Sequence, residues 1–553
     1  MNETNQRIRY SLWIALVGAV FFIPWLGRVH LFDWDEINFA EISREMLVLG
    51  EYLRVYVNFD PFWEKPPLFF WLQALAMAGF GVGEFAARLP NAICGIITLI
   101  VLFNIGKTLY NSRFGLLWAG TYFGSVLPFL YFKSGIIDPW FNLFIFLGLY
   151  FFILAYWRRD RTEGIQLQRS QWWYLLLSGL MVGLGILTKG PVAYLIPGLV
   201  MAVYWVWQRF RFYVHAPQFL FYSLIAFAVA ASWYGLFFID QFEAFSAYQY
   251  RLLSTPDAGH KGFPGYHFIV VLVGCFPMSI FAIRAFFRME NEAFDHRQDF
   301  KIWMQFLCWT VLILFTIVKS KIVHYSSLSY FPLSFLAALV IHKIMDGRLS
   351  LNGWMRGGLW ALTALYLIIL LALPYAGLNI DVIKPLFSKD AFALANLEAE
   401  VRWTGWEVLP GIFLLLMMLL FMRLTRRGQL MASFRVLLGG TALFVMLTLA
   451  FFVKRIEGYS QRAAVEFFKS KADEDCYLAA YGYKSYVHLF YGAPQNGDKC
   501  CFKNEACIQR LLHEPLDKPA YIVTKITKVK ELQNLPGMTE IGRQNGFVFY
   551  RRE

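Results

Sequence analysis

Long apolar segments alternate with short polar ones along most of the chain. Runs of about 17 to 24 residues without an ionisable side chain recur, and each is long enough to cross roughly 30 Å of hydrocarbon as a helix. Thirteen segments fit this description: residues 10–28, 88–106, 114–132, 139–157, 172–188, 190–208, 217–239, 268–283, 302–318, 325–341, 357–378, 408–422 and 436–453. The pattern predicts an all-α polytopic membrane protein with about 13 transmembrane helices.

One further apolar segment, residues 66–82, would reverse the orientation of everything after it if it were a span. Without it, the loops on the side of Arg7 and Arg9 carry two to four Lys or Arg each, and the opposite loops carry fewer. Cytoplasmic loops are the positive ones. We therefore expect residues 66–82 to lie at the outer interface, and the first span to be an uncleaved signal anchor, since no small-residue cleavage pattern follows it.

This topology divides the chain into a transmembrane domain, residues 1–453, and an outer domain, residues 454–553. Two more long outer segments follow from it: residues 29–87, with interfacial helices, and residues 240–267, a flexible loop. In the tail, "SQRAAVEFFKSKA" indicates an amphipathic helix, and "CYLAAYG", "AYIVTK" and "GFVFYRR" indicate strands. The tail is thus a small α/β domain, periplasmic in a bacterium.

Composition supports this fold class and excludes some functions. The chain is 58% hydrophobic and 16% charged, which is typical of a polytopic membrane protein. Its net charge of +13 lies mainly in loops, so we expect no nucleic-acid partner. Four cysteines fall in the tail: Cys476, Cys500, Cys501 and Cys507. An even number suits disulfides in an oxidising compartment, but their pairing cannot be derived from the sequence.

Ionisable side chains are almost missing from the spans and gather at their outer ends. Proton-coupled transporters usually keep such groups at mid-membrane, so that class is disfavoured. The gathered residues are Asp33, Asp35, Glu36, Arg44, Glu64, Lys65, Lys133, Asp138, Lys189, Arg251, His260, Lys261, Lys319, Lys321 and His324. Carboxylates mixed with Lys and Arg at this depth suit a phosphate-bearing lipid whose tail stays in the bilayer.

The order of several motifs resembles the GT-C membrane glycosyltransferases that use polyprenyl-phosphate sugars, such as the protein mannosyltransferases. These motifs are "DWDE" after the first span, "EKPPL", "GEFAARLP", and an acid after the third span in "SGIIDPWFNL". Within that group, "FAEISREML" followed by "EKPPLFFW" resembles the lipid A aminoarabinose transferases. The resemblance implies a GT-C fold. It also implies transfer of 4-amino-4-deoxy-L-arabinose from undecaprenyl phosphate to lipid A phosphates in the periplasm, which gives resistance to polymyxin.

The resemblance implies roles for three residues. Asp35 matches the catalytic acid after the first span, Asp138 matches the second acid, and Tyr325 matches a position beside the lipid-phosphate pocket. A helix cap or an interface charge is the structural alternative for Asp35, because a helix with an apolar face follows it in "INFAEISREML".

The remaining site residues are cations and metal ligands. Lys65, beside two prolines, is the first choice for contacting the carrier phosphate, and Arg251 could clamp it; a snorkelling side chain is the alternative for Lys65. The other binding candidates are Arg44, Lys319 and Lys321. No cofactor is expected to be obligatory. A divalent ion, if bound, would take Glu64 and His260, which is a weak signal without clustered spacing.

We therefore predict a multi-pass glycosyltransferase of the bacterial inner membrane, active as a monomer at the periplasmic face. Its donor would be an undecaprenyl-phosphate sugar and its acceptor lipid A, with direct displacement inverting the anomeric centre. One alternative is a related hexose or mannose transferase acting on a protein or lipopolysaccharide hydroxyl. Another is a lipid or glycan transporter, although we find neither mid-membrane polar groups nor inverted repeats.

Overall fold

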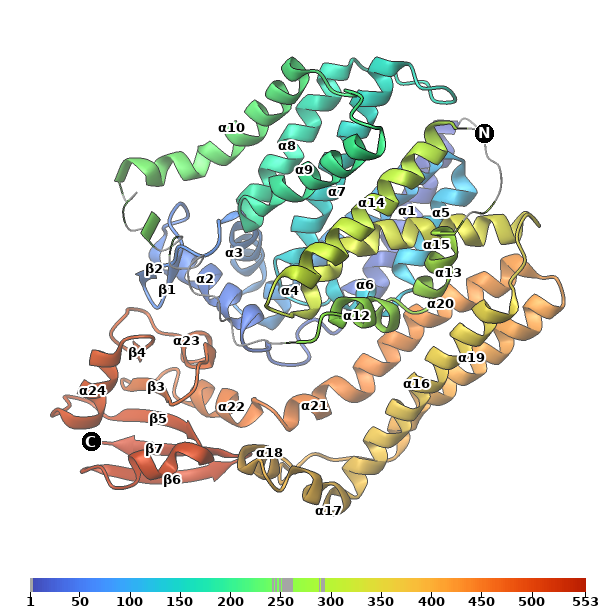
Figure 1. Cartoon of the computed structure of the whole chain (residues 1–553). Helices are drawn as coiled ribbons and strands as arrows, with labels where there is room; N and C mark the ends of the chain where they lie inside the picture. Colours follow the sequence, from blue (N-terminus) through green and yellow to red (C-terminus); the bar gives the residue numbers. More distant parts are fainter. Residues whose placement is uncertain are drawn as a thin grey trace.

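The computed structural model describes residues 3–240, 243, 246–247, 250, 262–287, 289 and 294–553. Most of the chain forms a helical bundle (Figure 1). Its helices are α1 (Glu3–Phe22), α4 (Glu84–Leu109), α5 (Ser112–Phe123), α6 (Val126–Tyr131), α7 (Asp138–Asp160), α8 (Gln171–Lys189), α9 (Val192–Trp207), α10 (Ala216–Asp240), α12 (Tyr266–Gly274), α13 (Met278–Ala285), α14 (His296–Ile317), η1 (Val323–Ser329), α15 (Tyr330–Met345), α16 (Gly353–Leu378), α19 (Leu409–Arg426) and α20 (Leu430–Thr448).

Every one of the thirteen predicted spans overlaps at least one of these helices. Among the described residues, nine helices are long and apolar enough to cross a membrane, or ten if the bent pair α12 and α13 is one span. The other three predicted spans correspond to α1, which begins in a charged stretch, to the broken pair α5 and α6, and to the short helix α9. The chain is a multi-pass membrane protein.

Two predicted spans are not single straight helices. Within residues 114–132, α5 ends at Phe123 and α6 begins at Val126. Gly124 lies at this break against α20, where an added Cβ would stand 2.4 Å from the Leu438 carbonyl oxygen. Within residues 268–283, α12 and α13 meet at an angle of 117°. Hydropathy does not register such breaks, because both arms are apolar.

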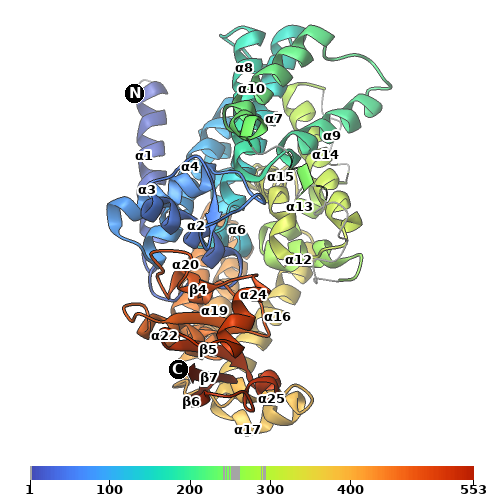
Figure 2. The ribbon, with the colours of Figure 1, turned by 90° about the vertical axis from the view of Figure 1, so that its left-hand side faces the viewer.

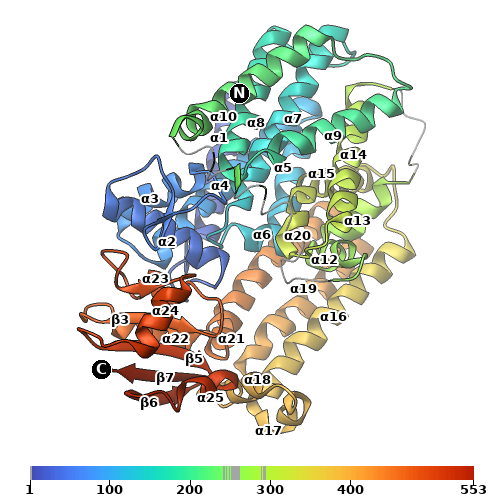
Figure 3. The same ribbon diagram turned by 60° about the vertical axis from the view of Figure 1, so that its left-hand side comes forward.

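The segment after α1 forms a wedge of short elements. It contains α2 (Asp35–Leu49), a hairpin of β1 (Tyr56–Val57) and β2 (Asp60–Pro61), and α3 (Leu68–Phe80). With thirteen residues, α3 is shorter than a membrane span requires. In Figures 2 and 3 this segment, in blue, lies between the bundle and the C-terminal domain, in red. Helix α2 is accordingly buried from Glu36 to Met46, polar residues included.

The C-terminal domain follows α20 through the π-helical turn η4 (Leu449–Val453), α21 (Lys454–Gly458) and α22 (Arg462–Ser470). Its five-stranded sheet has the order β4-β3-β5-β7-β6, in which β4, β3 and β5 are parallel and β7 and β6 are antiparallel. The strands are β3 (Tyr477–Tyr481), β4 (Cys500–Cys501), β5 (Ala520–Lys525), β6 (Met538–Gln544) and β7 (Phe547–Arg552), with α23 (Val487–Phe490), α24 (Glu505–His513) and α25 (Val529–Leu532) between them. The predicted helix and three predicted strands are confirmed.

Two features of this domain could not be derived from the sequence. The tail cysteines form one disulfide, Cys501–Cys507, while Cys476 and Cys500 are buried thiols. One hydrophobic core also joins the domain to the wedge, since Phe39 of α2 and Phe468 of α22 belong to the same buried cluster. The connection between α16 and α19 forms a small lobe that contacts the C-terminal domain, where Phe392 packs against Phe547. Its elements are α17 (Ile380–Ile383), η2 (Lys384–Phe387), α18 (Ala391–Asn396) and η3 (Trp406–Val408).

Candidate active site

Two carboxylates from distant parts of the chain meet at the end of the bundle that faces the C-terminal domain. Asp35 is the first residue of α2 and Asp138 is the first residue of α7. His324 of η1 stands between them: its Nε2 lies 3.6 Å from Asp35 Oδ2 and 3.9 Å from Asp138 Oδ2. Asp138 is buried, whereas the Asp35 side chain is 46% exposed. The pair therefore has one fixed member and one that is open to a ligand.

Lys189 completes the environment of the buried acid. It is the last residue of α8, and its Nζ donates a hydrogen bond of 2.6 Å to Asp138 Oδ1. The same ammonium lies 5.4 Å from the ring centroid of Tyr325 and 5.5 Å from that of Phe141, within cation–π range. The predicted phosphate-pocket residue Tyr325 thus lies directly beside the acids.

Glu64 and Lys65 form the next pair at this site. Lys65 Nζ lies 2.9 Å from Glu64 Oε1, and the ammonium is within electrostatic reach of Asp138. Burial alone would raise the pKa of Glu64, but the Lys65 ammonium beside it holds that pKa below its usual range. Lys503 and Lys484 of the C-terminal domain act on Glu64 in the same direction. Glu64 is therefore ionised. The three lysines around this one carboxylate leave an excess of positive charge beside Asp35 and Asp138.

The C-terminal domain also holds the loop that carries Asp35. Asp33 Oδ1 accepts a hydrogen bond from the Tyr486 amide, and the Asp33 amide donates to Gln461 Oε1. The Trp34 indole donates to the Lys484 carbonyl, and the Lys484 ammonium lies 4.3 Å from the Trp34 ring centroid. Burial raises the pKa of Asp33 to about 6. Asp33 therefore has the structural role of fixing the loop, and Asp35 is left facing His324.

Two of the other predicted binding residues have partners of their own, and a third is exposed. Arg44 is wrong as a phosphate ligand, because it is buried against Glu41 and donates to the Pro494 carbonyl. Lys321 caps the end of α14, donating to the carbonyls of Phe315, Thr316 and Val318. Lys319 is exposed.

The structure does not support the proposed metal site of Glu64 and His260. Arg251 and His260 lie outside the described residues. Glu64 is paired with Lys65, and no group of three or more His, Cys, Asp or Glu close enough to hold a metal occurs in the described part of the chain.

Sequence reasoning missed His324 and Lys189 as members of the site. Both stood among the ionisable residues at the outer ends of spans, but neither belongs to a motif that marks it. Their partner Asp138 lies 51 residues from Lys189 and 186 residues from His324 in the sequence. Only the packing of α7 against α8 and η1 brings these side chains together.

Comparisons with known proteins show which proteins this chain resembles. Residues 64–234 match the family model of dolichyl-phosphate-mannose-protein mannosyltransferases. An "undecaprenyl phosphate-alpha-4-amino-4-deoxy-L-arabinose arabinosyl transferase" of Erwinia tasmaniensis is 27% identical over 71% of this chain and 70% of its own length. The protein of the same name from Pectobacterium carotovorum is 25% identical over 75% of this chain and 73% of its own length. The chain is a glycosyltransferase and is similar to the GT-C membrane enzymes.

The fold of this glycosyltransferase extends over its whole length. The crystal structure of ArnT from Cupriavidus metallidurans bound to undecaprenyl phosphate superposes with a TM-score of 0.74, covering 98% of both chains at 18% identity. The apo structure of the same protein gives a TM-score of 0.73. The predicted GT-C fold, with its small C-terminal domain, is thereby confirmed.

Proposed function

We propose that this glycosyltransferase moves 4-amino-4-deoxy-L-arabinose from undecaprenyl phosphate to a phosphate of lipid A at the periplasmic face of the bacterial inner membrane. The observation that carries the proposal is the grouping of Asp35, His324 and Asp138 beside Lys189 and Lys65. The names of the relatives support the choice of sugar and carrier. An ammonium placed on lipid A would neutralise its phosphate and so confer resistance to polymyxin.

The proposed step is a direct displacement. A phosphate oxygen of the acceptor forms a bond to the anomeric carbon, and the bond from that carbon to the carrier phosphate breaks. The electron pair leaves with undecaprenyl phosphate, whose added negative charge Lys65 and Lys189 would stabilise. Tyr325 would border this phosphate.

Asp35 would act through its charge. A phosphate monoester is already anionic near neutral pH, so this acceptor needs no base to remove a proton. A half-exposed carboxylate can instead stabilise the positive charge that develops on the sugar ring, or pair with the ammonium of the sugar. Asp138, fixed by Lys189, would hold His324 in place between the acids.

The test is transfer by the purified protein in lipid nanodiscs, with lipid A or a hydroxyl-bearing protein or lipopolysaccharide as acceptor and a set of undecaprenyl-phosphate sugars as donors. Mass spectrometry of the lipid A product is the readout. We expect the aminoarabinose donor to be used and hexose donors not. Transfer of a neutral hexose to a hydroxyl acceptor, with none to lipid A, would refute the proposed substrates.

Two variants assign the roles. Asp35→Asn should lose transfer but still bind undecaprenyl phosphate, and Lys65→Ala should weaken that binding. Glu51→Gln is the control, because Glu51 lies just beyond the other end of α2. Normal turnover by Asp35→Asn would remove Asp35 from the site. We propose no obligatory metal ion, so treatment with EDTA should leave turnover unchanged.

A further inference from the structure

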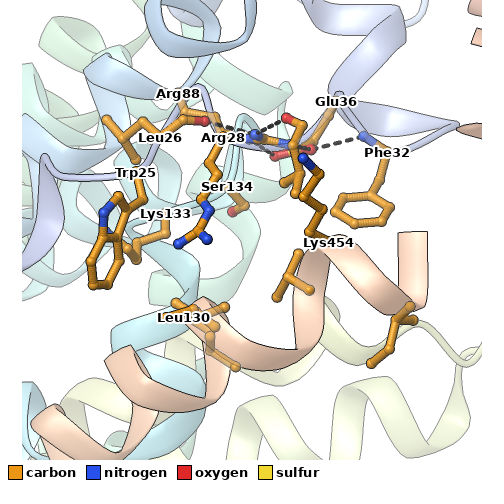
Figure 4. A pocket seen from close by; sticks show the side chains of 15 residues that line it. Trp25, Leu26, Arg28, Phe32, Glu36, Arg88, Leu130, Lys133, Ser134 and Lys454 are labelled. Carbon is orange, nitrogen blue, oxygen red and sulfur yellow. Dashed lines mark hydrogen bonds and ion pairs between the residues drawn. The ribbon is translucent and has the colours of Figure 1, made fainter. Parts of the chain in front are cut away.

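A second site lies behind the α2 N-terminus, in a cavity of about 390 Å³ (Figure 4). It is bounded by the chain after α1, the α6–α7 connection, and η4 with the start of α21. Most of its wall is apolar, with Trp25, Leu26, Leu130 and Val453 among the lining residues. A chamber with such walls suits hydrocarbon.

Cations line the same cavity. Arg28 and Lys454 reach into it from opposite walls, and both side chains are exposed (Figure 4). Lys133 lines it too, donating its hydrogen bonds to the carbonyls of Phe21, Phe22 and Pro24 at the end of α1. No ion pair joins Arg28 or Lys454 to a carboxylate within the described residues. These two charges are therefore available to a ligand.

Among the described residues, the one carboxylate that lines the cavity, Glu36, already has partners within the protein. Glu36 pairs with Arg88 at 2.7 Å and accepts hydrogen bonds from the amides of Phe32 and Gly135. Burial alone would raise the pKa of Glu36, but the Arg88 guanidinium holds that pKa below its usual range. The cavity thus keeps an excess of positive charge, which favours an anion. An anion that also fills apolar walls is a phosphate-bearing lipid.

The cavity shares its wall with the active site. Glu36 follows Asp35 in α2, so the two side chains project about 100° apart around the helix. Asp35 faces His324, whereas Glu36 faces the cavity. Gly135, which donates to Glu36, lies three residues before Asp138. Lys65 and Lys189 lie on the other side, at the acids, so a lipid in the cavity would approach them from behind α2.

We propose that this cavity is the acceptor site, in which Arg28 and Lys454 hold a phosphate of lipid A while the apolar wall takes part of an acyl chain. The inference rests on the proposed function, because it requires a phosphorylated lipid acceptor. Lys133 would reinforce the site: burial lowers its pKa to about 7, and an anion beside it would favour its charged form.

The experiment measures acceptor and carrier separately. Native mass spectrometry of the full-length protein in nanodiscs gives the affinity for lipid A, for dephosphorylated lipid A, for phosphatidylglycerol and for undecaprenyl phosphate. We expect Arg28→Ala/Lys454→Ala to weaken lipid A binding by at least about fivefold, as the loss of two partly solvated charge contacts implies. Binding of undecaprenyl phosphate should be unchanged.

A second variant leaves the charges intact. Ala450 lines the cavity, so Ala450→Trp should fill it and weaken lipid A binding while carrier binding is retained. Leu443→Trp, on the same stretch of helix but exposed outside the cavity, is the matched control and should bind lipid A normally. If Arg28→Ala/Lys454→Ala and Ala450→Trp both weaken lipid A binding while Leu443→Trp does not, the loss comes from the cavity and not from general misfolding.

The outcomes distinguish the two proposals. Equal binding of phosphatidylglycerol and lipid A, both lost in Arg28→Ala/Lys454→Ala, would make the cavity a general lipid site and overturn its acceptor role. Unchanged lipid A affinity in both cavity variants would overturn it as well. Absence of aminoarabinose transfer by the wild type, despite lipid A binding that depends on Arg28 and Lys454, would refute the proposed function alone.

Discussion

We predict that Lys189 and Asp138 are energetically coupled, so that replacing either residue alone lowers the free energy of unfolding. The side chains are 17% and 5% exposed, and 2.6 Å separates Nζ from Oδ1. Removing one partner of such a pair leaves an uncompensated charge, at a typical cost of about 3 to 5 kcal/mol. Because Lys189 is partly exposed, we expect Lys189→Met to cost about 3 kcal/mol, at the lower end.

A double-mutant cycle tests this value. In Lys189→Met/Asp138→Asn both charges are absent, so the double variant should be more stable than the sum of the single changes predicts, by at least about 2 kcal/mol. The assay is reversible unfolding in mixed micelles, run alongside transfer activity. Transfer activity should be lost in both single variants and in the double variant. The double change recovers stability but does not put the charges back at the site. Additive changes in unfolding free energy would refute the reasoning.

Two further predictions concern stability. The pKa of Asp33 is raised to about 6 from its usual 3.8, so the folded state binds its proton more tightly than the unfolded state and stability falls as pH rises through this interval. Asp33→Asn should therefore gain roughly 2 kcal/mol more over the wild type at pH 8 than at pH 4; an equal effect at both pH values would contradict the burial of a charge. At the α5–α20 contact, Gly124→Ala should lower the unfolding free energy by about 1 to 3 kcal/mol, because its Cβ meets the Leu438 backbone. Gly439→Ala, with nothing within 4 Å of its added Cβ, is the control, and thermal melts of the two compare them.

The spans could be predicted because the bilayer imposes one length and one composition on every crossing helix. Breaks within spans follow from contacts between helices, as at Gly124 against Leu438, and hydropathy carries no information about such contacts. The apolar spacing of Phe39, Ile42, Met46 and Leu49 indicated a buried face on α2. The first three are buried, whereas Leu49, at the end of the helix, is 43% exposed. The spacing gave no sign that the opposite face is also covered, since that cover comes from other elements of the first loop and from the far end of the chain.

The site could be predicted only in part, for a related reason. Asp35, Asp138 and Tyr325 were found through the resemblance to a family, and Lys65 through its charge beside two prolines; the structure places them together. Arg44 was misassigned because its partner is local: Glu41 lies three residues earlier, a spacing that places both on one side of the helix. That spacing was visible in the sequence. His324 carries no comparable local signal, because both of its acidic neighbours come from other helices.

The wedge has a consequence for how the chain is made. Residues around Leu31 leave the ribosome early, yet the hydroxyl that accepts the Leu31 amide belongs to Tyr491, 460 residues later. The Asp33 contact with Tyr486 spans a similar interval. All the membrane helices can therefore be inserted while the first loop still lacks the cover that fixes it. A nascent chain stopped before residue 454 would have every crossing segment in place, but its first loop would lack the contacts with Tyr486 and Tyr491. We therefore expect this loop to be fixed only after the last domain has been synthesised.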